Sequence, residues 1–385
     1  MQAFEFSSPT LDFGAGCSRK LASLTSNFGH RVLVISGSEP SRHSALLQCL
    51  LESGQQIDFL SVSDEPDLDL VRSGSANARE LEVQCVVAIG GGSVLDTAKA
   101  IAAMATQSSD LLDHLEVIGQ GRPLKQDPLP WIALPTTAGT GSEATRNAVL
   151  TCPQQRLKVS LRDRRMLPRL TLLDPELALS CPPRVTANSG MDALTQCLES
   201  LLSVRANAMS NALASEGLVL CLKHLRSAFH NGQDLEARGG MSLAAHFSGL
   251  ALASAGLGVV HALASPLGDH LAQSHGALCA SMLAAGFELN SRAIATRGDA
   301  AARQRLQRVV DLLLGHTQGT AEQAAIVLSQ LQSDLRIPRL NALGLPPRGP
   351  QRSELIAAAL RSNSMKSNPV PLEQEEMEHL LEQAN

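Results

Sequence analysis

Short apolar runs alternate with helical patterns through the first half of the chain. Continuous apolar runs at residues 31–36, 86–92 and 131–135 predict buried strands that end at glycine or proline. Between them, residues 44–54 are amphipathic and residues 93–106 are rich in alanine, as expected of helices. This alternation of uninterrupted apolar strands with helices is typical of a mostly parallel sheet that helices cover on both faces.

The pattern changes in the second half. Residues 144–161 resemble a β-hairpin, and residues 169–173 one more short strand. Beyond residue 182 an Ala/Leu-rich helical pattern continues, with breaks expected near residues 231–232, 239–240 and 315 and a proline-rich loop at 344–350. We therefore predict a doubly wound α/β domain over residues 1–182 and an all-helical domain over residues 183–385.

Composition excludes several classes of function. The net charge of -5 is spread over interspersed acidic and basic residues, and aromatic residues make up 2% of the chain. These values argue against binding to nucleic acid or to a membrane surface. The 8 cysteines are dispersed without a CxxC pair, which is typical of reduced thiols. We see no signal peptide and no apolar run long enough to span a bilayer, and we expect a cytoplasmic protein.

Three glycines, Gly90, Gly91 and Gly92, follow a predicted strand, and Ser93 opens the next predicted helix. Glycines let backbone N–H groups approach a phosphate, and a helix N-terminus favours an anion. Ser93 is expected to cap the helix, with Asp96 completing a pattern similar to a capping box. This loop predicts a ligand that carries phosphate.

A second loop, at residues 135–143, also follows a predicted strand. It contains the hydroxyl residues Thr136, Thr137, Thr140 and Ser142 among glycines. Open α/β sheets bind ligands beyond the carboxyl ends of their strands. Two such loops together favour a dinucleotide.

In the helical half, Asp192 and Gln196 are four residues apart and share one face of a predicted helix. A carboxylate and a histidine at this spacing form a clamp for a divalent cation, but an amide oxygen in the second position is a weaker ligand. The segment at 189–200 therefore raises the question of a metal site.

Together these motifs resemble the iron-containing, or group III, alcohol dehydrogenase family. The resemblance rests on GGGSVLDTAKA (90–100), PTTAGTGSEAT (135–145), DPELALSCPP (174–183), SGMDALTQCLES (189–200) and residues 248–280. It implies the dehydroquinate synthase-like architecture, with a dinucleotide domain, a helical domain and an active site in the cleft between them. It also implies hydride transfer between NAD(P) and a small alcohol or aldehyde, whose oxygen a divalent metal, iron or zinc, polarises.

The resemblance assigns roles to individual residues. Its cofactor positions are Gly91, Gly92, Ser93, Asp96, Thr136, Thr137, Thr140, Ser142 and Lys158. Its metal positions, which would also be catalytic, are Asp192, His261 and His275. Gln196 stands where the family has another histidine ligand, and Ser265 stands where the family often has a histidine that relays protons. We expect Gln196 to complete the metal site, with His270 as a possible substitute donor.

Three alternatives remain open. A metal-independent reductase of the maleylacetate reductase type would polarise the carbonyl with hydrogen bonds from Gln196, His261 and His275. A lyase on the dehydroquinate synthase-like fold would share the architecture, but the segments GMDALTQ (190–196) and GLGVVH (256–261) argue against it. An inactive nucleotide-binding protein would also share it, but the complete phosphate loops argue against that reading.

The end of the second strand bears on the choice of nicotinamide cofactor. Gly37, Ser38 and Arg42 suit a 2′-phosphate, although Glu39 is close by. We predict NADP in preference to NAD. Phe4 and Phe6 alternate as in an edge strand that could pair across subunits, and we expect a homodimer or a larger homo-oligomer.

Overall fold

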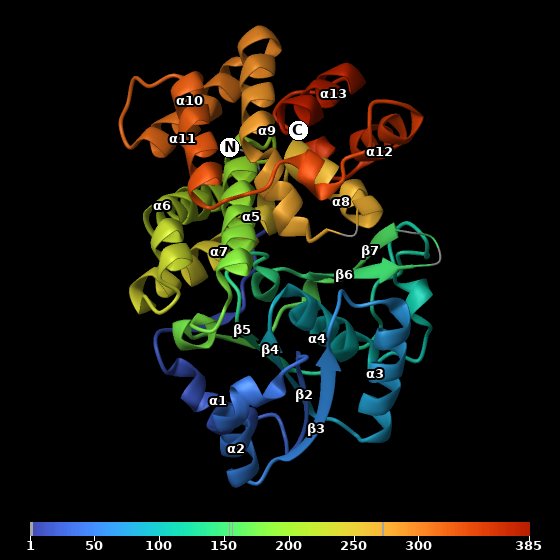
Figure 1. Ribbon diagram of the computed structural model, residues 1–385. Helices are drawn as coiled ribbons and strands as arrows, with labels where there is room; N and C mark the ends of the chain where they lie inside the picture. The colour runs from blue at the N-terminus through green and yellow to red at the C-terminus, as the bar shows by residue number, and fades with distance from the viewer. Residues whose placement is uncertain (1–2, 154, 156, 272) are drawn as a thin grey trace. The chain divides into compact units, whose positions relative to one another are not determined.

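The computed structural model describes residues 3–153, 155, 157–271 and 273–385 (Figure 1). The chain divides into two compact units. One comprises residues 7–181, and the other comprises residues 182–385 together with residues 3–6. The N-terminal residues 3–6 thus group with the helical unit and not with the α/β unit that follows them in sequence.

The α/β unit contains a six-stranded sheet and a separate two-stranded hairpin. The six strands are parallel and lie in the order β1-β8-β5-β4-β2-β3. They are β1 (Thr10–Phe13), β2 (Arg31–Gly37), β3 (Gln56–Val62), β4 (Cys85–Gly90), β5 (Trp131–Pro135) and β8 (Leu170–Leu173). The hairpin pairs β6 (Asn147–Cys152) with β7 (Leu157–Arg162). The helices are α1 (Leu21–Thr25), α2 (Ser44–Glu52), α3 (Leu68–Glu80) and α4 (Gly92–Met104).

Helices cover both faces of the parallel sheet, because successive strand residues point to opposite sides. Leu33 and Ile35 of β2 pack in one cluster with residues of α3 and α4. Val32 and Val34 of the same strand pack in another cluster with residues of α1 and α2. The predicted doubly wound sheet is confirmed.

The apolar pattern does not predict β1, β3 or α3. β3 is an edge strand on which Phe59 is 52% exposed, so it needs no continuous apolar run. The buried face of α3 includes the small residues Gly74 and Ser75. Because neither residue is strongly apolar, the apolar periodicity that would predict this helix is weak. Residues 3–9, which include Phe4 and Phe6, form no strand within this chain, and strand pairing across subunits stays a prediction.

The second unit is helical, as predicted. Its helices are α5 (Pro183–Leu202), α6 (Ala208–His230), α7 (Leu235–Ala255), α8 (Val259–Leu271), α9 (His275–Arg297), α10 (Ala300–Leu314), α11 (Ala321–Asp334), α12 (Pro350–Arg361) and α13 (Gln374–Gln383). α5 contacts α6, α7 and α9, and residues 190–202 of α5 are all buried. A helix buried on every side forms the centre of its unit, as Figure 1 shows for α5.

Two of the predicted helix breaks are confirmed and one is wrong. α6 ends at His230, and Gly315 follows α10 in the left-handed conformation with φ 70°. Gly239 and Gly240, in contrast, lie inside α7. A Cβ atom on Gly240 would lie 2.2 Å from Cδ2 of His224, so this glycine permits close packing of α7 against α6.

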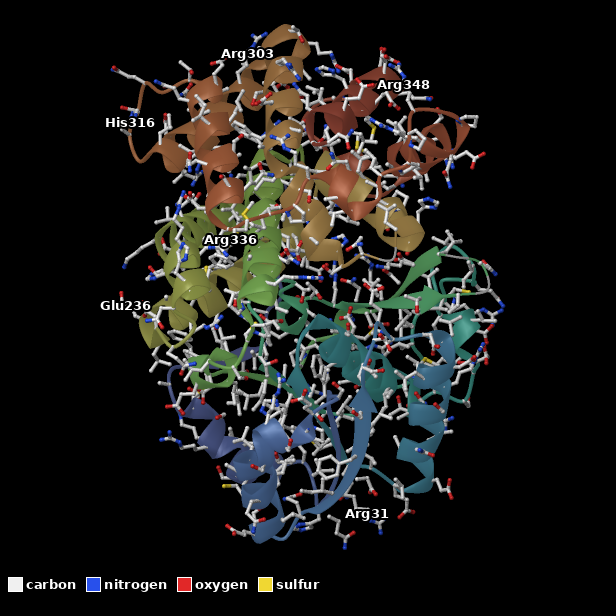
Figure 2. All side chains as sticks on the ribbon, viewed as in Figure 1. Arg31, Glu236, Arg303, His316, Arg336 and Arg348 are labelled. Carbon is white, nitrogen blue, oxygen red and sulfur yellow. The ribbon has the colours of Figure 1, made fainter. Side chains whose placement is uncertain are left out.

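The labelled charged side chains in Figure 2 lie at the surface of their units, and Arg303 and Arg348, for example, are exposed. Among the described residues no single helix has the length and apolar character to cross a bilayer. α7 and α8 meet those criteria only as a pair, bent by 102°.

Candidate functional site

The carboxyl ends of three neighbouring strands bring the predicted cofactor loops to one edge of the sheet. β2 ends at Gly37, β4 at Gly90 and β5 at Pro135, and the register sets Gly90 opposite Pro135. The connection order reverses between β2 and β4, because β3 lies on one side of β2 and β4 on the other. Ligands of open α/β sheets bind at such a switch point.

Glycines allow the loops after β4 and β5 to approach each other closely. A Cβ atom on Gly92 would lie 2.8 Å from Cγ2 of Thr140, and one on Gly91 would lie 3.2 Å from Oγ1 of Thr137. Gly91 is the N-cap of α4, and no side chain caps this helix. Its first N–H groups and the nearby threonine hydroxyls therefore offer donors to a phosphate.

The expectation that Ser93 caps α4 together with Asp96 is wrong. Since α4 already begins at Gly92, Ser93 lies within its first turn. Asp96 accepts hydrogen bonds from Ser142 Oγ at 2.5 Å and from the Val149 N–H at 3.0 Å. In this structure Asp96 thus connects α4 to the loop after β5 and to the hairpin, and its contact with a cofactor stays a prediction.

Lys99 strengthens the same connection. Its side chain is fully buried, and Nζ donates to the carbonyls of Ser142 at 2.8 Å and Asn147 at 2.7 Å and to Oγ1 of Thr145 at 3.1 Å. Burial lowers the pKa of Lys99, while the nearby Asp96 raises it. Lys99 was not predicted as a site residue, although it follows Asp96 by three residues and so shares a helix face with it.

Lys158 and Arg42, two further residues of the predicted cofactor site, each form an ion pair with a glutamate. Lys158 Nζ lies 2.8 Å from Glu65 Oε1. Arg42 donates from Nε to Glu39 Oε2 at 2.8 Å, in an exposed pair just beyond Gly37 and Ser38.

In the helical unit, three helices bring together four residues that could hold a metal ion. They are Asp192 on α5, His261 on α8, and His275 and Cys279 on α9, and we call them the donor cluster. Gly276 makes the approach of α9 possible, because a Cβ atom there would lie 2.8 Å from the Asn188 carbonyl oxygen of α5.

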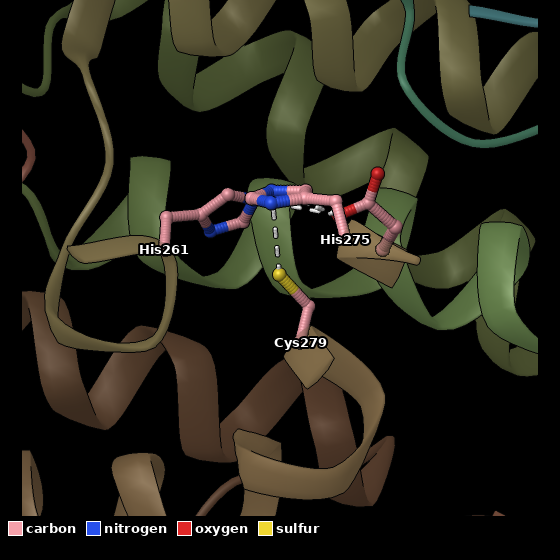
Figure 3. A group of neighbouring side chains, drawn as sticks. His261, His275 and Cys279 are labelled. Atoms are coloured by element: carbon pink, nitrogen blue, oxygen red, sulfur yellow. Dashed lines mark hydrogen bonds and ion pairs between the residues drawn. The ribbon is translucent and has the colours of Figure 1, made fainter. Parts of the chain in front are cut away.

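The ligand atoms of the donor cluster all lie within 4.8 Å of one another. His261 Nε2 is 3.4 Å from Asp192 Oδ1, His275 Nε2 is 4.0 Å from the same oxygen, and Cys279 Sγ is 3.6 Å from His275 Nε2. Figure 3 shows the side chains of His261, His275 and Cys279 converging on one point. The His275 side chain is 34% exposed, whereas those of Asp192 and His261 are buried.

Glu199, two helical turns beyond Asp192, fixes the orientation of His261. Its buried carboxylate accepts hydrogen bonds from the N–H groups of Gly258 at 2.8 Å and Val260 at 2.7 Å. His261 Nδ1 lies 2.7 Å from Glu199 Oε2 and donates to it, since a carboxylate can only accept. His261 Nε2 is then the nitrogen that faces the donor cluster, and its lone pair would bind a metal ion in place of a proton.

The donor cluster fits a divalent metal ion. Asp192 Oδ1 and His261 Nε2 are buried and have no hydrogen-bond partner among the described residues, although they face each other. A tetrahedral ion with bonds of about 2.0–2.3 Å would set its ligand atoms about 3.3–3.8 Å apart, which is close to the measured separations. Carboxylate oxygen, imidazole nitrogen and cysteine sulfur are all zinc ligands.

Burial and neighbouring groups act in opposite directions on the pKa values of the donor cluster. Burial alone would raise the pKa of Asp192, but the neighbouring imidazoles of His261 and His275 lower it. Burial likewise opposes protonation of His261, yet Cys279 and the carboxylates beside it raise its pKa well above the ordinary value. Burial raises the pKa of the Cys279 thiol to about 12.

The other predicted metal residues lie differently. Gln196 donates from Nε2 to Asp192 Oδ2 at 3.1 Å, and its Oε1 accepts from Ser248 Oγ at 2.6 Å. The substitute donor His270 is not in the donor cluster, because its ring lies beside Gln351 at 3.1 Å. Ser265 is half-buried on α8.

Sequence reasoning missed two residues at this site. Cys279 follows His275 by four residues and Glu199 follows Asp192 by seven, so each pair shares a helix face. Those spacings were the available signal, but a lone buried cysteine or glutamate on a predicted helix has many structural explanations.

We expect Glu199→Gln to weaken metal binding at the donor cluster by about 10- to 100-fold, the usual effect of losing a group that orients a metal-binding histidine. The amide has one acceptor oxygen in place of two, so it cannot keep all three bonds. Competition with a chromogenic chelator measures the affinity. The exposed Glu216→Gln on α6 is the control, and equal affinities of the two variants would contradict the role of Glu199.

Comparison with known proteins adds the family context. The family model described as "Iron-containing alcohol dehydrogenase" matches residues 9–175, and the one described as "Fe-containing alcohol dehydrogenase family, C-terminal" matches residues 186–385. Alcohol dehydrogenase 4 of Schizosaccharomyces pombe is 35% identical over 324 residues, which is 84% of this chain and 74% of that protein. A 1-propanol dehydrogenase of Salmonella typhimurium is 32% identical over 364 residues, which is 89% of this chain and 90% of that protein.

Solved structures share the whole architecture. Sulfoacetaldehyde reductase from Bifidobacterium kashiwanohense, in complex with NAD+, superposes with a TM-score of 0.86 at 26% identity. The match covers 100% of this chain and 99% of that chain.

Proposed function

The chain belongs to the iron-containing alcohol dehydrogenase family, and from this membership we propose that it interconverts a small alcohol and its aldehyde with a nicotinamide cofactor and a divalent metal. The reaction removes a hydride from the carbinol carbon to NAD(P)+ and a proton from the hydroxyl group. The products are the aldehyde, NAD(P)H and a proton.

The observation that carries the metal-assisted form of this proposal is the pair of buried atoms without partners, Asp192 Oδ1 and His261 Nε2. Leaving a polar atom buried and unbonded costs about 1–3 kcal/mol. A cation among these atoms would remove that cost. A reductase that works without metal would retain it, so the metal-independent alternative is not favoured.

The residues of the helical unit have distinct roles in this proposal. Asp192, His261 and His275 bind the metal, and Glu199 holds His261 in the tautomer that presents Nε2. The bound metal supplies a Lewis acid that stabilises negative charge on the substrate oxygen. His275 is partly exposed, so this side of the donor cluster is the side that substrate would reach.

The residues of the α/β unit bind and orient the dinucleotide. Gly91 and Gly92 admit the phosphates to the N-terminus of α4, and the threonines of the second loop donate to them. Lys99, Asp96 and Ser142 hold the two loops together. This arrangement supports a dinucleotide as the co-substrate.

Nicotinamide absorbance tests this proposal directly. Purified protein is assayed with a panel of primary alcohols, diols and the corresponding aldehydes, with both cofactors. We expect reversible turnover with at least one pair. No turnover across the panel by protein that still binds a dinucleotide would refute the proposal.

We further expect NADP to be the preferred cofactor, with kcat/KM at least about tenfold higher than for NAD, the effect of about 1.4 kcal/mol. A 2′-phosphate would compete with Glu39 for the Arg42 guanidinium, which suits phosphate geometry. Arg42→Ala should abolish the preference, whereas Arg31→Ala at the opposite end of β2 should keep it. A preference of the unaltered protein for NAD would contradict this assignment.

A further inference from the structure

The fourth member of the donor cluster sets this chain apart from the ligand set that its family resemblance implies. We infer that Cys279 is the fourth metal ligand, and that Gln196 is a positioning residue that orients Asp192. This inference rests on the metal-assisted form of the proposed function. It changes the expected ligand set from Asp192, Gln196, His261 and His275 to one in which sulfur replaces the amide.

The position of Cys279 supports this role. It lies on α9 one turn after His275, so both side chains leave the same helix face. Its Sγ is 3.6 Å from His275 Nε2, and it belongs to the group whose ligand atoms are all within 4.8 Å. Cys279 is fully buried. A thiol in this place faces one carboxylate and two imidazoles, which is a metal-binding environment.

The hydrogen bonds of Gln196 turn its amide oxygen toward Ser248 and its amide nitrogen toward Asp192. An amide binds a metal through its oxygen, and Gln196 Oε1 accepts the hydrogen bond from the buried Ser248 hydroxyl. The amide nitrogen donates to Asp192 Oδ2. Rotating the amide by 180° would set its oxygen against the carboxylate, so these partners fix its orientation. Gln196 therefore holds Oδ2 and leaves Oδ1 directed at the donor cluster.

The two changes complement each other. A histidine four residues after Asp192 would supply a neutral nitrogen ligand, and the glutamine in its place orients the carboxylate instead. Cys279 restores the number of donors from a different helix. Binding replaces the thiol proton, which passes to solvent, so one thiolate and one carboxylate together balance the charge of a divalent cation.

A thiolate ligand also changes which metal the site selects. Soft sulfur donors favour zinc and cobalt over magnesium, manganese and calcium, and zinc lies above iron(II) in the usual affinity order. We therefore infer a zinc site in a chain whose family is named for iron. The same argument predicts that cobalt(II) is a faithful spectroscopic probe, because it accepts the same ligands.

Cobalt(II) added to the metal-free full-length protein tests the inference. We expect one cobalt per chain and a sulfur-to-cobalt charge-transfer band in the near ultraviolet. Cys279→Ala should lose that band and bind cobalt at least about tenfold more weakly, which corresponds to 1.4 kcal/mol. The matched control is Cys221→Ala, which removes an equally buried thiol on α6 and should keep both the band and the affinity.

Gln196→Leu supplies the second half of the test. If Gln196 only positions Asp192, the variant should bind cobalt about 10- to 100-fold more weakly. At saturating cobalt it should still show the full charge-transfer and visible spectra of the unaltered protein. A visible spectrum of altered coordination in Gln196→Leu, together with an unchanged spectrum in Cys279→Ala, would overturn the inference.

The remaining outcomes separate the inference from the function on which it rests. Stoichiometric cobalt without a sulfur band in the unaltered protein overturns the Cys279 assignment and leaves a metal-assisted dehydrogenase intact. Turnover of alcohols by protein that binds neither cobalt, zinc nor iron overturns both.

Discussion

Asp192→Asn is expected to lower kcat/KM for alcohol oxidation by about 1,000-fold or more, because it removes the negative charge of the donor cluster and keeps its shape. Lewis-acid stabilisation of an alkoxide is worth several kcal/mol, and each 1.36 kcal/mol corresponds to a factor of ten. The neutral amide still accepts the Gln196 hydrogen bond through its oxygen. The loss should therefore come from the metal site and not from the packing of α5.

Initial rates at saturating cofactor, with metal content measured on the same sample, check this expectation. The dinucleotide dissociation constant serves as the internal control, since the proposed cofactor residues all lie in the α/β unit. Activity within tenfold of the unaltered protein, or an equal loss of dinucleotide affinity, would count against the assigned role of Asp192.

Lys99→Met is expected to destabilise the α/β unit by about 3–5 kcal/mol, as for other buried charged groups that lose their partner. The change removes the donor shared by the carbonyls of Ser142 and Asn147 and by Thr145. It also leaves Asp96 without its cationic neighbour. Since these groups hold the loop after β5 against α4, dinucleotide affinity should fall as well.

Calorimetric unfolding of the full-length protein, with and without a dinucleotide, measures both effects. The exposed Lys125→Met in the same unit should change stability by no more than about 0.5 kcal/mol. If Lys99→Met unfolds at the same temperature as this control, the buried lysine does not support the loops.

The strands buried on both faces were the easiest to predict from the sequence. β5 matches its apolar run at residues 131–135 without an error at either end. β3 was missed because it is an edge strand, whose exposed Phe59 and neighbouring polar residues interrupt the pattern. Apolar runs report burial, so they cannot reveal strands that are only partly covered.

Glycines were harder to interpret, because the same residue serves opposite purposes. Gly315 ends α10, as predicted, and it adopts the left-handed conformation. Gly240 lies inside α7, where it makes room for His224 of α6. The sequence alone does not show which helices lie close together. A glycine inside a helix is explained only when the neighbouring helix that packs against it is known.

Three residues of the donor cluster could be predicted from the sequence, but the fourth residue and the hydrogen bonds of Gln196 could not. The resemblance identified Asp192, His261 and His275, which the structure brings together. It transferred the ligand role to Gln196 by position, whereas the hydrogen bonds of that amide depend on Ser248 of another helix. Cys279 lies 87 residues after Asp192 in sequence, and only the close packing of α5 and α9 at Gly276 reveals that the two share a site.

Elemental analysis paired with turnover tests the central claim most directly. Freshly purified full-length protein is divided, one half is treated with chelator, and metal content and alcohol-dependent NAD(P) reduction are measured on both. The metal-assisted mechanism predicts one divalent ion per chain, loss of turnover on chelation, and recovery when zinc is returned. Undiminished turnover by protein free of metal would contradict it.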